Sequence, residues 1–178
     1  MKDFVADMKV IRERARKDIE DGAITGNYQA NRESVIKVLN DALATEIVCV
    51  LRYRRHYFTA RGIHSKAIAE EFMTHSVEEQ GHADKIAERI SQLNGEPDLN
   101  PSGLNARSHS EYKEGSDLIS MIREDLIAER IAIESYSEII RWLGEADPTS
   151  RRLIEKILEV EEEHAEELAN LLTSLSSN

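Results

Sequence analysis

Apolar side chains recur every three or four residues along most of this chain, which is the spacing that places them on one face of an α-helix. The spacing alternates between three and four almost throughout, so the apolar faces form the seams of a left-handed helical bundle. A shorter amphipathic stretch over 3–20 predicts an additional N-terminal helix. The four long stretches predict helices over about 30–59, 65–94, 116–144 and 149–174.

The connections between these stretches predict the topology. Short links are expected at 61–64 and 144–148, the second with Asp147 as the helix cap and Pro148 at the first helical position. The longer segment 94–116 is able to run the length of a helix of about 38 Å. We therefore expect an all-α fold: a four-helix bundle of two antiparallel hairpins joined by one long crossover.

As a whole, the chain is expected to be a single domain. Within it, we assign residues 1–28 to an N-terminal amphipathic helix and linker, and residues 29–178 to the bundle.

Composition supports a helical protein that handles cations. Charged residues make up 32% of the chain and aromatic residues 5%, with only 3 prolines and 8 glycines to interrupt helices. The net charge of −11 argues against a general nucleic-acid binder. The single cysteine, Cys49, favours a reducing cytoplasm. We expect neither a membrane span nor a signal peptide, because no apolar run is long enough for either.

The seams contain acidic residues where apolar ones are expected. The motif Glu-x-x-His occurs twice, each time about one helical hairpin downstream of another seam glutamate. Residues three apart share a helix face, so each motif is able to hold one ion. Four carboxylates and two imidazoles over four helices are the ligand set of a di-iron or di-manganese bundle, and two divalent ions would balance their charge. The six predicted metal ligands are Glu46, Glu79, His82, Glu129, Glu161 and His164.

Buried ion pairs are the alternative explanation, but these seams offer no basic residues that would neutralise four carboxylates. Oxygen-rich ligation with two imidazoles suits iron or manganese, and no thiolate is placed to favour zinc or copper. Tyr53 lies on the stripe of Glu46 and is expected to donate an electron, to hydrogen-bond a ligand, or simply to pack. Asp125 is expected to orient a ligand histidine or to be a partly exposed aspartate. His75 is expected to pack beside the centre rather than to be a seventh ligand.

At these residues the chain resembles the bacterioferritins. The resemblance covers about residues 30–174 and implies a ferritin-like topology, with the six predicted ligands on the ferroxidase positions of that family. It places Tyr53 on the tyrosine near that centre. It implies that Glu79 bridges the ions together with Glu129 or Glu161, and we expect Glu46 and Glu161 as terminal ligands. The segments that carry the resemblance are 40–46, 78–84, 124–129 and 161–164.

Three departures refine this resemblance. Gln80 stands where bacterioferritins carry the haem-binding methionine, so no haem is expected. Too few residues follow His164 for the fifth helix of ferritins, and an extra helix precedes the bundle. The chain therefore also resembles the Dps-like proteins with a bacterioferritin-type site, although their paired cysteines are not matched. This favours a cage of 12 subunits over one of 24.

The resemblance implies a cytoplasmic ferroxidase and iron-storage or detoxification subunit that limits oxidative stress. It would bind two Fe(II) ions per subunit, with O2 or H2O2 as oxidant, within a homo-oligomeric cage. Two alternatives stay open. One is a non-storage di-iron or di-manganese oxidase or catalase. The other is a Dps-type DNA-protecting protein, against which the acidic charge and the mixed-sign N-terminal stretch argue.

Overall fold

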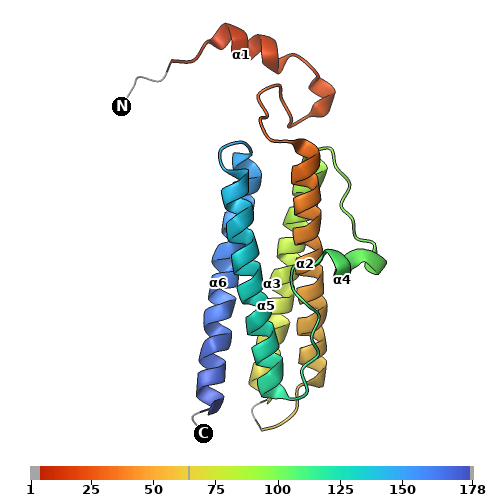
Figure 1. The fold of residues 1–178 in the computed structure, drawn as a ribbon, viewed down its shortest axis with the longest axis vertical. Coiled ribbons are helices and arrows are strands. Elements are labelled where there is room, and N and C mark those ends of the chain that lie inside the picture. Colours follow the sequence, from red (N-terminus) through yellow and green to blue (C-terminus); the bar gives the residue numbers. More distant parts are fainter. Residues whose placement is uncertain (1–4, 64, 177–178) are drawn as a thin grey trace.

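The computed structural model of the protein describes residues 5–63 and 65–176. Four long helices form the expected bundle (Figure 1), in which α2 packs mainly against α3 and α5 mainly against α6. Their ends lie within a few residues of the ranges predicted from the sequence. No helix in the described part of the chain combines the length and the apolar character needed to cross a membrane. The four helices are α2 (Arg32–Thr59), α3 (Ser65–Gln92), α5 (Leu118–Leu143) and α6 (Pro148–Ser176).

The turn between α5 and α6 shows how local sequence sets the helix ends. Gly144 follows the last residue of α5 with a φ of +49°, a left-handed conformation that glycine adopts without strain. Asp147 then caps α6, because its carboxylate accepts a hydrogen bond of 2.9 Å from the backbone N–H of Ser150. Pro148 is the first helical residue, as predicted from the sequence.

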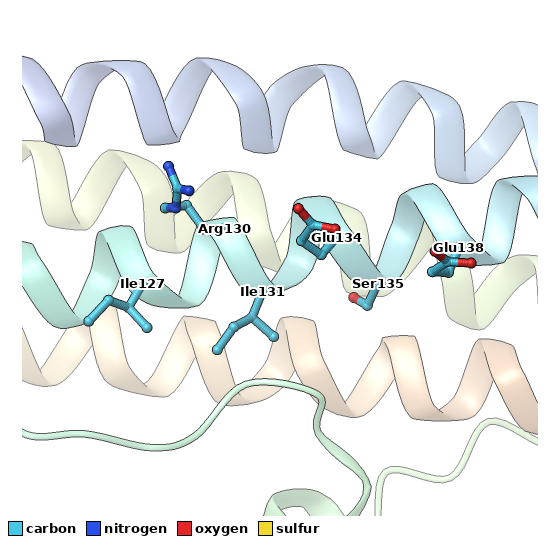
Figure 2. A pocket seen from close by; sticks show the side chains of 6 residues that line it. All are labelled: Ile127, Arg130, Ile131, Glu134, Ser135 and Glu138. Carbon is cyan, nitrogen blue, oxygen red and sulfur yellow. The ribbon is translucent and has the colours of Figure 1, made fainter.

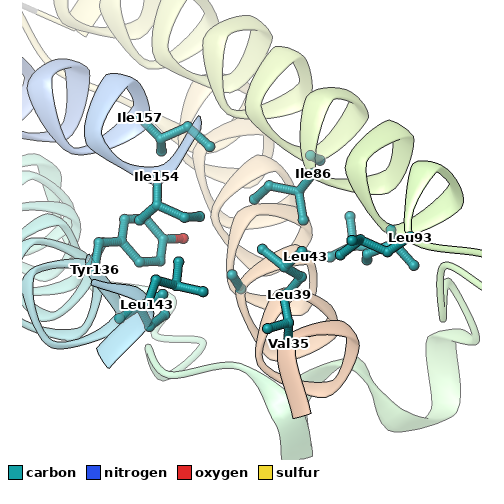
Figure 3. Packing of buried hydrophobic residues seen from close by; sticks show 14 residues of the cluster. Val35, Leu39, Leu43, Ile86, Leu93, Tyr136, Leu143, Ile154 and Ile157 are labelled. Atoms are coloured by element: carbon teal, nitrogen blue, oxygen red, sulfur yellow. The ribbon is translucent and has the colours of Figure 1, made fainter. Parts of the chain in front are cut away.

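Two hydrophobic clusters fill the bundle, one towards each end. The larger one joins the start of α2, the end of α3, the end of α5 and the start of α6 (Figure 3). The smaller one contains Tyr53, Phe72 and Leu168 near the opposite end. Each fully buried leucine, isoleucine or phenylalanine stabilises the fold by roughly 1.5–3 kcal/mol. Between the two clusters lies a polar layer, which is the part of the bundle that the hydrophobic effect does not explain.

The crossover between α3 and α5 is partly ordered by a short helix. α4 (Leu104–Arg107) packs against α2, and Leu104 contacts the buried Ala44 and Val48. Arg107 forms an ion pair with Asp98 in the same segment. The crossover therefore covers one side of α2 instead of only linking the two hairpins.

The N-terminal helix is shorter than the sequence predicts. The expected helix over 3–20 is α1 (Met8–Ala15) followed by a separate turn of 3-10 helix over Ile19–Asp21. The helix begins at Met8 because Asp7 caps it, and it ends at Ala15. Asp18, with a left-handed φ of +48°, precedes the separate 3-10 turn. Residues 3 and 4 of the expected helix lie outside the described residues. None of the residues of α1 is buried, and Figure 1 shows the helix standing away from the bundle.

Part of the segment assigned to a linker is attached to the bundle. Ile24 and Ala30 pack against the larger hydrophobic cluster. The Tyr28 hydroxyl donates a hydrogen bond of 2.9 Å to Asp147, the residue that caps α6. The chain therefore contacts the end of the bundle before α2 begins.

Candidate metal centre

The polar layer of the bundle consists of buried carboxylate and imidazole side chains contributed by all four long helices. They are between 0% and 3% exposed, although charged groups are rarely buried without a partner. The structure thus brings together the complete set of residues that the sequence predicted as metal ligands. These are Glu46 on α2, Glu79 and His82 on α3, Glu129 on α5, and Glu161 and His164 on α6.

These six side chains form two overlapping groups, each of a size that fits one metal ion. In each group, one ligand atom from every residue lies within 4.8 Å of the others. Glu79 and Glu161 belong to both groups, so their carboxylates lie between the two positions. The two groups are Glu46, Glu79, His82 and Glu161, and Glu79, Glu129, Glu161 and His164.

Each histidine presents its Nδ1 atom to the carboxylates. His82 Nδ1 lies 3.0 Å from Glu161 Oε1 and 3.3 Å from Glu46 Oε2. His164 Nδ1 lies 3.3 Å from Glu79 Oε1. On its other side, His164 Nε2 lies 2.9 Å from Glu78 Oε2, an arrangement that fixes the ring and leaves Nδ1 free to bind an ion.

Many ligand atoms of this layer have no hydrogen-bond partner, although they are close together. Such unpartnered buried atoms are rare in folded proteins, because each costs about 1–3 kcal/mol. A pair of divalent cations with oxygen and imidazole ligands would satisfy all of them at once, so the residues fit a dinuclear centre. The unpartnered atoms are Glu46 Oε2, Glu79 Oε1, His82 Nδ1, Glu129 Oε2, both carboxylate oxygens of Glu161, and His164 Nδ1.

Burial and mutual repulsion perturb the ionisation of this layer. The pKa values of Glu79 and Glu161 are raised well above the ordinary range, first by burial and then by the charges of the neighbouring glutamates. Burial lowers the pKa of His164, which favours the neutral imidazole that binds metals. Cation binding therefore displaces protons from the carboxyl groups, and the cations take over the neutralisation of their charge.

Two tyrosines hold the outer carboxylates by reciprocal hydrogen bonds. The Tyr53 hydroxyl on α2 donates to Glu129 on α5, and the Tyr136 hydroxyl on α5 donates to Glu46 on α2. Burial raises the pKa of both phenols well above 10, so both keep their protons. Of the roles left open for Tyr53, the structure shows the hydrogen bond to a predicted ligand. Tyr136 is not among the site residues predicted from the sequence.

Asp125 is neither beside a predicted ligand histidine nor partly exposed, the two positions that the sequence suggests. It is fully buried, and it does not contact His82 or His164 through any hydrogen bond or ion pair in the described residues. Its two carboxylate oxygens accept hydrogen bonds of 2.8 Å from Arg52 and from His56 instead. The seam pattern predicts neither partner, although the fold buries both Arg52 and His56 completely.

This network also ties the crossover to α2. Arg52 Nη1 donates a bond of 3.3 Å to the carbonyl of Glu111, and His56 Nε2 lies 3.0 Å from the carbonyl of Glu114. Arg52 Nη2 lies 3.5 Å from the sulfur of Cys49, which is also buried. Asp125 and its partners are therefore structural supports beside the polar layer.

A surface depression on α5 is unrelated to the six ligands. Figure 2 shows that its lining residues lie along one outward-facing side of that helix. None of the predicted ligands contributes to it, and it contains only exposed or half-buried side chains. Its lining residues are Ile127, Arg130, Ile131, Glu134, Ser135 and Glu138.

Comparison with known proteins gives results consistent with this geometry. The family profile of the ferritin-like domain matches residues 36–177. The bacterioferritin of Brucella melitensis biotype 1 is 32% identical over 145 residues, which cover 80% of this chain and 84% of that protein.

Two solved structures are similar in fold. One is described as a dodecameric thioferritin, the bacterioferritin-related protein of Bacteroides fragilis, with a TM-score of 0.80 and 30% identity. That match covers 84% of this chain and 90% of the other. The second is the bacterioferritin of Desulfovibrio desulfuricans, whose diiron site was captured in different catalytic states. It has a TM-score of 0.73 and 27% identity, over 83% of this chain and 85% of that one.

Proposed function

This chain belongs to the ferritin-like domain family, and we propose that it is a ferroxidase and a subunit of an iron-storing or iron-detoxifying cage. The observation that carries the proposal is the set of unpartnered ligand atoms on all six predicted ligands, within a layer that is otherwise closed to water. A protein that only needed a stable bundle would fill this layer with apolar side chains. Four buried carboxylates are tolerable when two divalent cations balance them.

The geometry supports a role for each ligand. Glu79 and Glu161 belong to both metal-sized groups, so we assign the bridging carboxylates to them. Glu46 with His82, and Glu129 with His164, complete the two ends. This assignment replaces the expectation that Glu161 is a terminal ligand, which sequence spacing alone did not test.

The reaction is the transfer of one electron from each of two Fe(II) ions to an oxidant. With O2 the pair of electrons and two protons yield H2O2, and with H2O2 they yield two molecules of water. Glu79 and Glu161 hold the two ions as a pair, so both electrons are available to one oxidant molecule. Tyr53 and Tyr136 keep the end carboxylates in place through their hydroxyl groups.

We expect the purified protein to bind about two Fe(II) ions per chain tightly under anaerobic conditions, and to oxidise them faster than buffer when O2 is admitted. Metal counting after desalting gives the stoichiometry, and absorbance of Fe(III) gives the rate. Binding of well under one ion per chain would sink the proposal. Tight binding of two ions with no accumulation of further iron would point to a non-storage di-iron enzyme.

The assembly is expected to be a hollow homo-oligomer of twelve subunits. One support is the similarity to the dodecameric Bacteroides fragilis protein. A second support is α1. Its Met8 and Val10 side chains are half exposed, and a neighbouring subunit would cover them. Twelve chains of 20.2 kDa give roughly 240 kDa, a mass that light scattering distinguishes easily from a 24-subunit shell. A mass near twice that value would reject the dodecamer, and a stable monomer would reject the cage.

A further inference from the structure

A second cluster of metal-binding side chains lies one helical turn away from the six ligands, between α3 and α6. At its centre is His75, whose side chain is 1% exposed. Its Nε2 atom lies 2.9 Å from Glu167 Oε2 and 3.6 Å from Glu71 Oε1. We propose that Glu71, His75 and Glu167 bind a third divalent transition-metal ion.

The separations between these atoms suit direct coordination. Metal–nitrogen and metal–oxygen bonds of about 2.0–2.2 Å, in tetrahedral or octahedral geometry, place neighbouring ligand atoms roughly 3.0–3.5 Å apart. The two distances from His75 Nε2 to the carboxylate oxygens lie close to this range. All three ligand atoms are within 4.8 Å of one another, so small rotations of the two glutamates suffice to close around an ion. One imidazole with two carboxylates suits Fe(II), Mn(II), Co(II) or Zn(II).

The hydrogen-bond partners of His75 are compatible with a metal ion at its Nε2 atom. The single hydroxyl proton of Tyr53 is donated to Glu129, so its oxygen faces His75 Nδ1 as an acceptor, at 3.2 Å. The carboxylate of Glu167 faces Nε2 and is also an acceptor. An ion at Nε2 fits this arrangement, because the single N–H of a neutral imidazole then lies at Nδ1 and donates to Tyr53, while the Nε2 lone pair binds the ion.

The two glutamates also lack a basic partner among the described ion pairs. Among the described residues, Glu71 and Glu167 form ion pairs with His75 and with no lysine or arginine. The pKa of Glu71 is raised, first by its partial burial and then, against the opposing influence of His75, by the charge of Glu167. A divalent ion would neutralise this pair, as the two ions of the dinuclear centre neutralise the four deeper carboxylates.

A competing group is less suited to a separate ion. His75, Glu78 and His164 also lie close enough together to hold one. However, Glu78 Oε2 is engaged by His164 Nε2 at 2.9 Å, and His164 Nδ1 faces the dinuclear centre. An ion bound to this group would replace the contact between Glu78 and His164 that orients His164 towards the dinuclear centre. The group of Glu71, His75 and Glu167 shares no residue with that centre.

The position of the third site suggests what it does. The Glu71 and Glu167 side chains are 39% and 53% exposed, whereas the six deeper ligands are buried. The ring of His75 stacks on that of His164, with centroids 4.0 Å apart and an interplanar angle of 17°. The site therefore lies between solvent and the dinuclear centre, where it would collect Fe(II) and supply it inward. This role, but not the existence of the site, rests on the proposed ferroxidase function.

The test is anaerobic equilibrium dialysis of the assembled full-length protein against Co(II), which O2-free buffer does not oxidise. The informative variant is Glu71→Gln combined with Glu167→Gln, which leaves His75 and the six deeper ligands in place. The matched control is Glu70→Gln combined with Glu166→Gln, which removes the same charge from exposed neighbours on the same two helices. We expect three ions per chain in the wild type and in the control, and two in the informative variant.

The affinity for the third ion is expected to fall at least about tenfold in the informative variant, since even the loss of an outer partner of a ligand has that effect. The initial rate of Fe(II) oxidation at low Fe(II) concentration should also fall several-fold in this variant. The number of tightly bound ions at the dinuclear centre should stay at two per chain. Saturation of the wild type at two ions, or three ions retained by the informative variant, would overturn the third site and leave the ferroxidase proposal intact. Loss of the third ion in the control as well would assign it to general surface charge. Failure of the wild type to bind the two tight ions would instead overturn the ferroxidase proposal.

Discussion

Replacing Glu161 with alanine is expected to slow Fe(II) oxidation by about a hundredfold or more while leaving the bundle folded. Loss of an outer partner of a metal ligand already costs about 10–100-fold in affinity or activity, and Glu161 is proposed to contact both ions. Both of its carboxylate oxygens lack a hydrogen-bond partner, so the fold loses no such contact when they are removed. Without metal, the variant also removes a buried acidic group whose ionisation is opposed by burial and by the neighbouring glutamates, which offsets part of the cost of the cavity.

Initial rates of Fe(III) formation, measured together with thermal unfolding of the metal-free proteins, check both halves of this expectation. Glu162→Ala is the matched control, because Glu162 is the exposed neighbour of Glu161 on the same helix. The control should retain the wild-type rate. A Glu161→Ala variant that oxidises Fe(II) at the wild-type rate would move the catalytic centre away from the polar layer.

Replacing Asp125 with alanine is expected to have the largest effect on stability, about 3–5 kcal/mol, because it leaves the fully buried Arg52 without its carboxylate. His56 loses its carboxylate partner at the same time. For a chain of this length such a loss corresponds to a fall in Tm of roughly 10 °C. The crossover should also loosen, because Arg52 and His56 hold its backbone carbonyls.

Thermal unfolding of the metal-free protein measures the effect without a contribution from ion binding. Glu134→Ala, at an exposed position of the same helix, is the control and should change Tm little. Combining Asp125→Ala with Arg52→Leu should recover part of the loss, because the cost arises from an uncompensated buried charge. If Asp125→Ala alone unfolds like the control, the Arg52–Asp125 pair does not stabilise the bundle.

The helices and the clustering of the six proposed ligands could be predicted from the sequence because both follow from periodicity. Residues three or four apart share a helix face, so an acidic residue within an apolar stripe must point into the core. Each Glu-x-x-His pair can therefore be recognised from the sequence of its own helix, without knowledge of the neighbouring helices. The two pairs are Glu79 with His82, and Glu161 with His164. Which carboxylate lies between the two ion positions depends on how the helices are rotated against each other. That rotation is set by packing across the bundle.

Arg52 and the crossover show why the rest could not be predicted. Arg52 is one residue away from Tyr53, and its burial depends on the crossover carbonyls that cover it. A periodic pattern along α2 carries no information about a segment that is distant in the sequence. One signal was available: Tyr53 and Tyr136 stand the same number of residues after Glu46 and Glu129. This internal repeat anticipates the reciprocal hydrogen bonds between the two hairpins.

The environment of Cys49 has a consequence for the chemical durability of the protein. Burial raises the pKa of this thiol to about 12, although the nearby Arg52 favours the thiolate. Because the thiolate is the form that reacts with peroxides, almost none of the reactive species is present at neutral pH. The side chain is also only 2% exposed. The proposed ferroxidase reaction uses or generates H2O2, and the chain would carry this cysteine one helical turn from Glu46 without sulfenic acid formation at Cys49 limiting its working life.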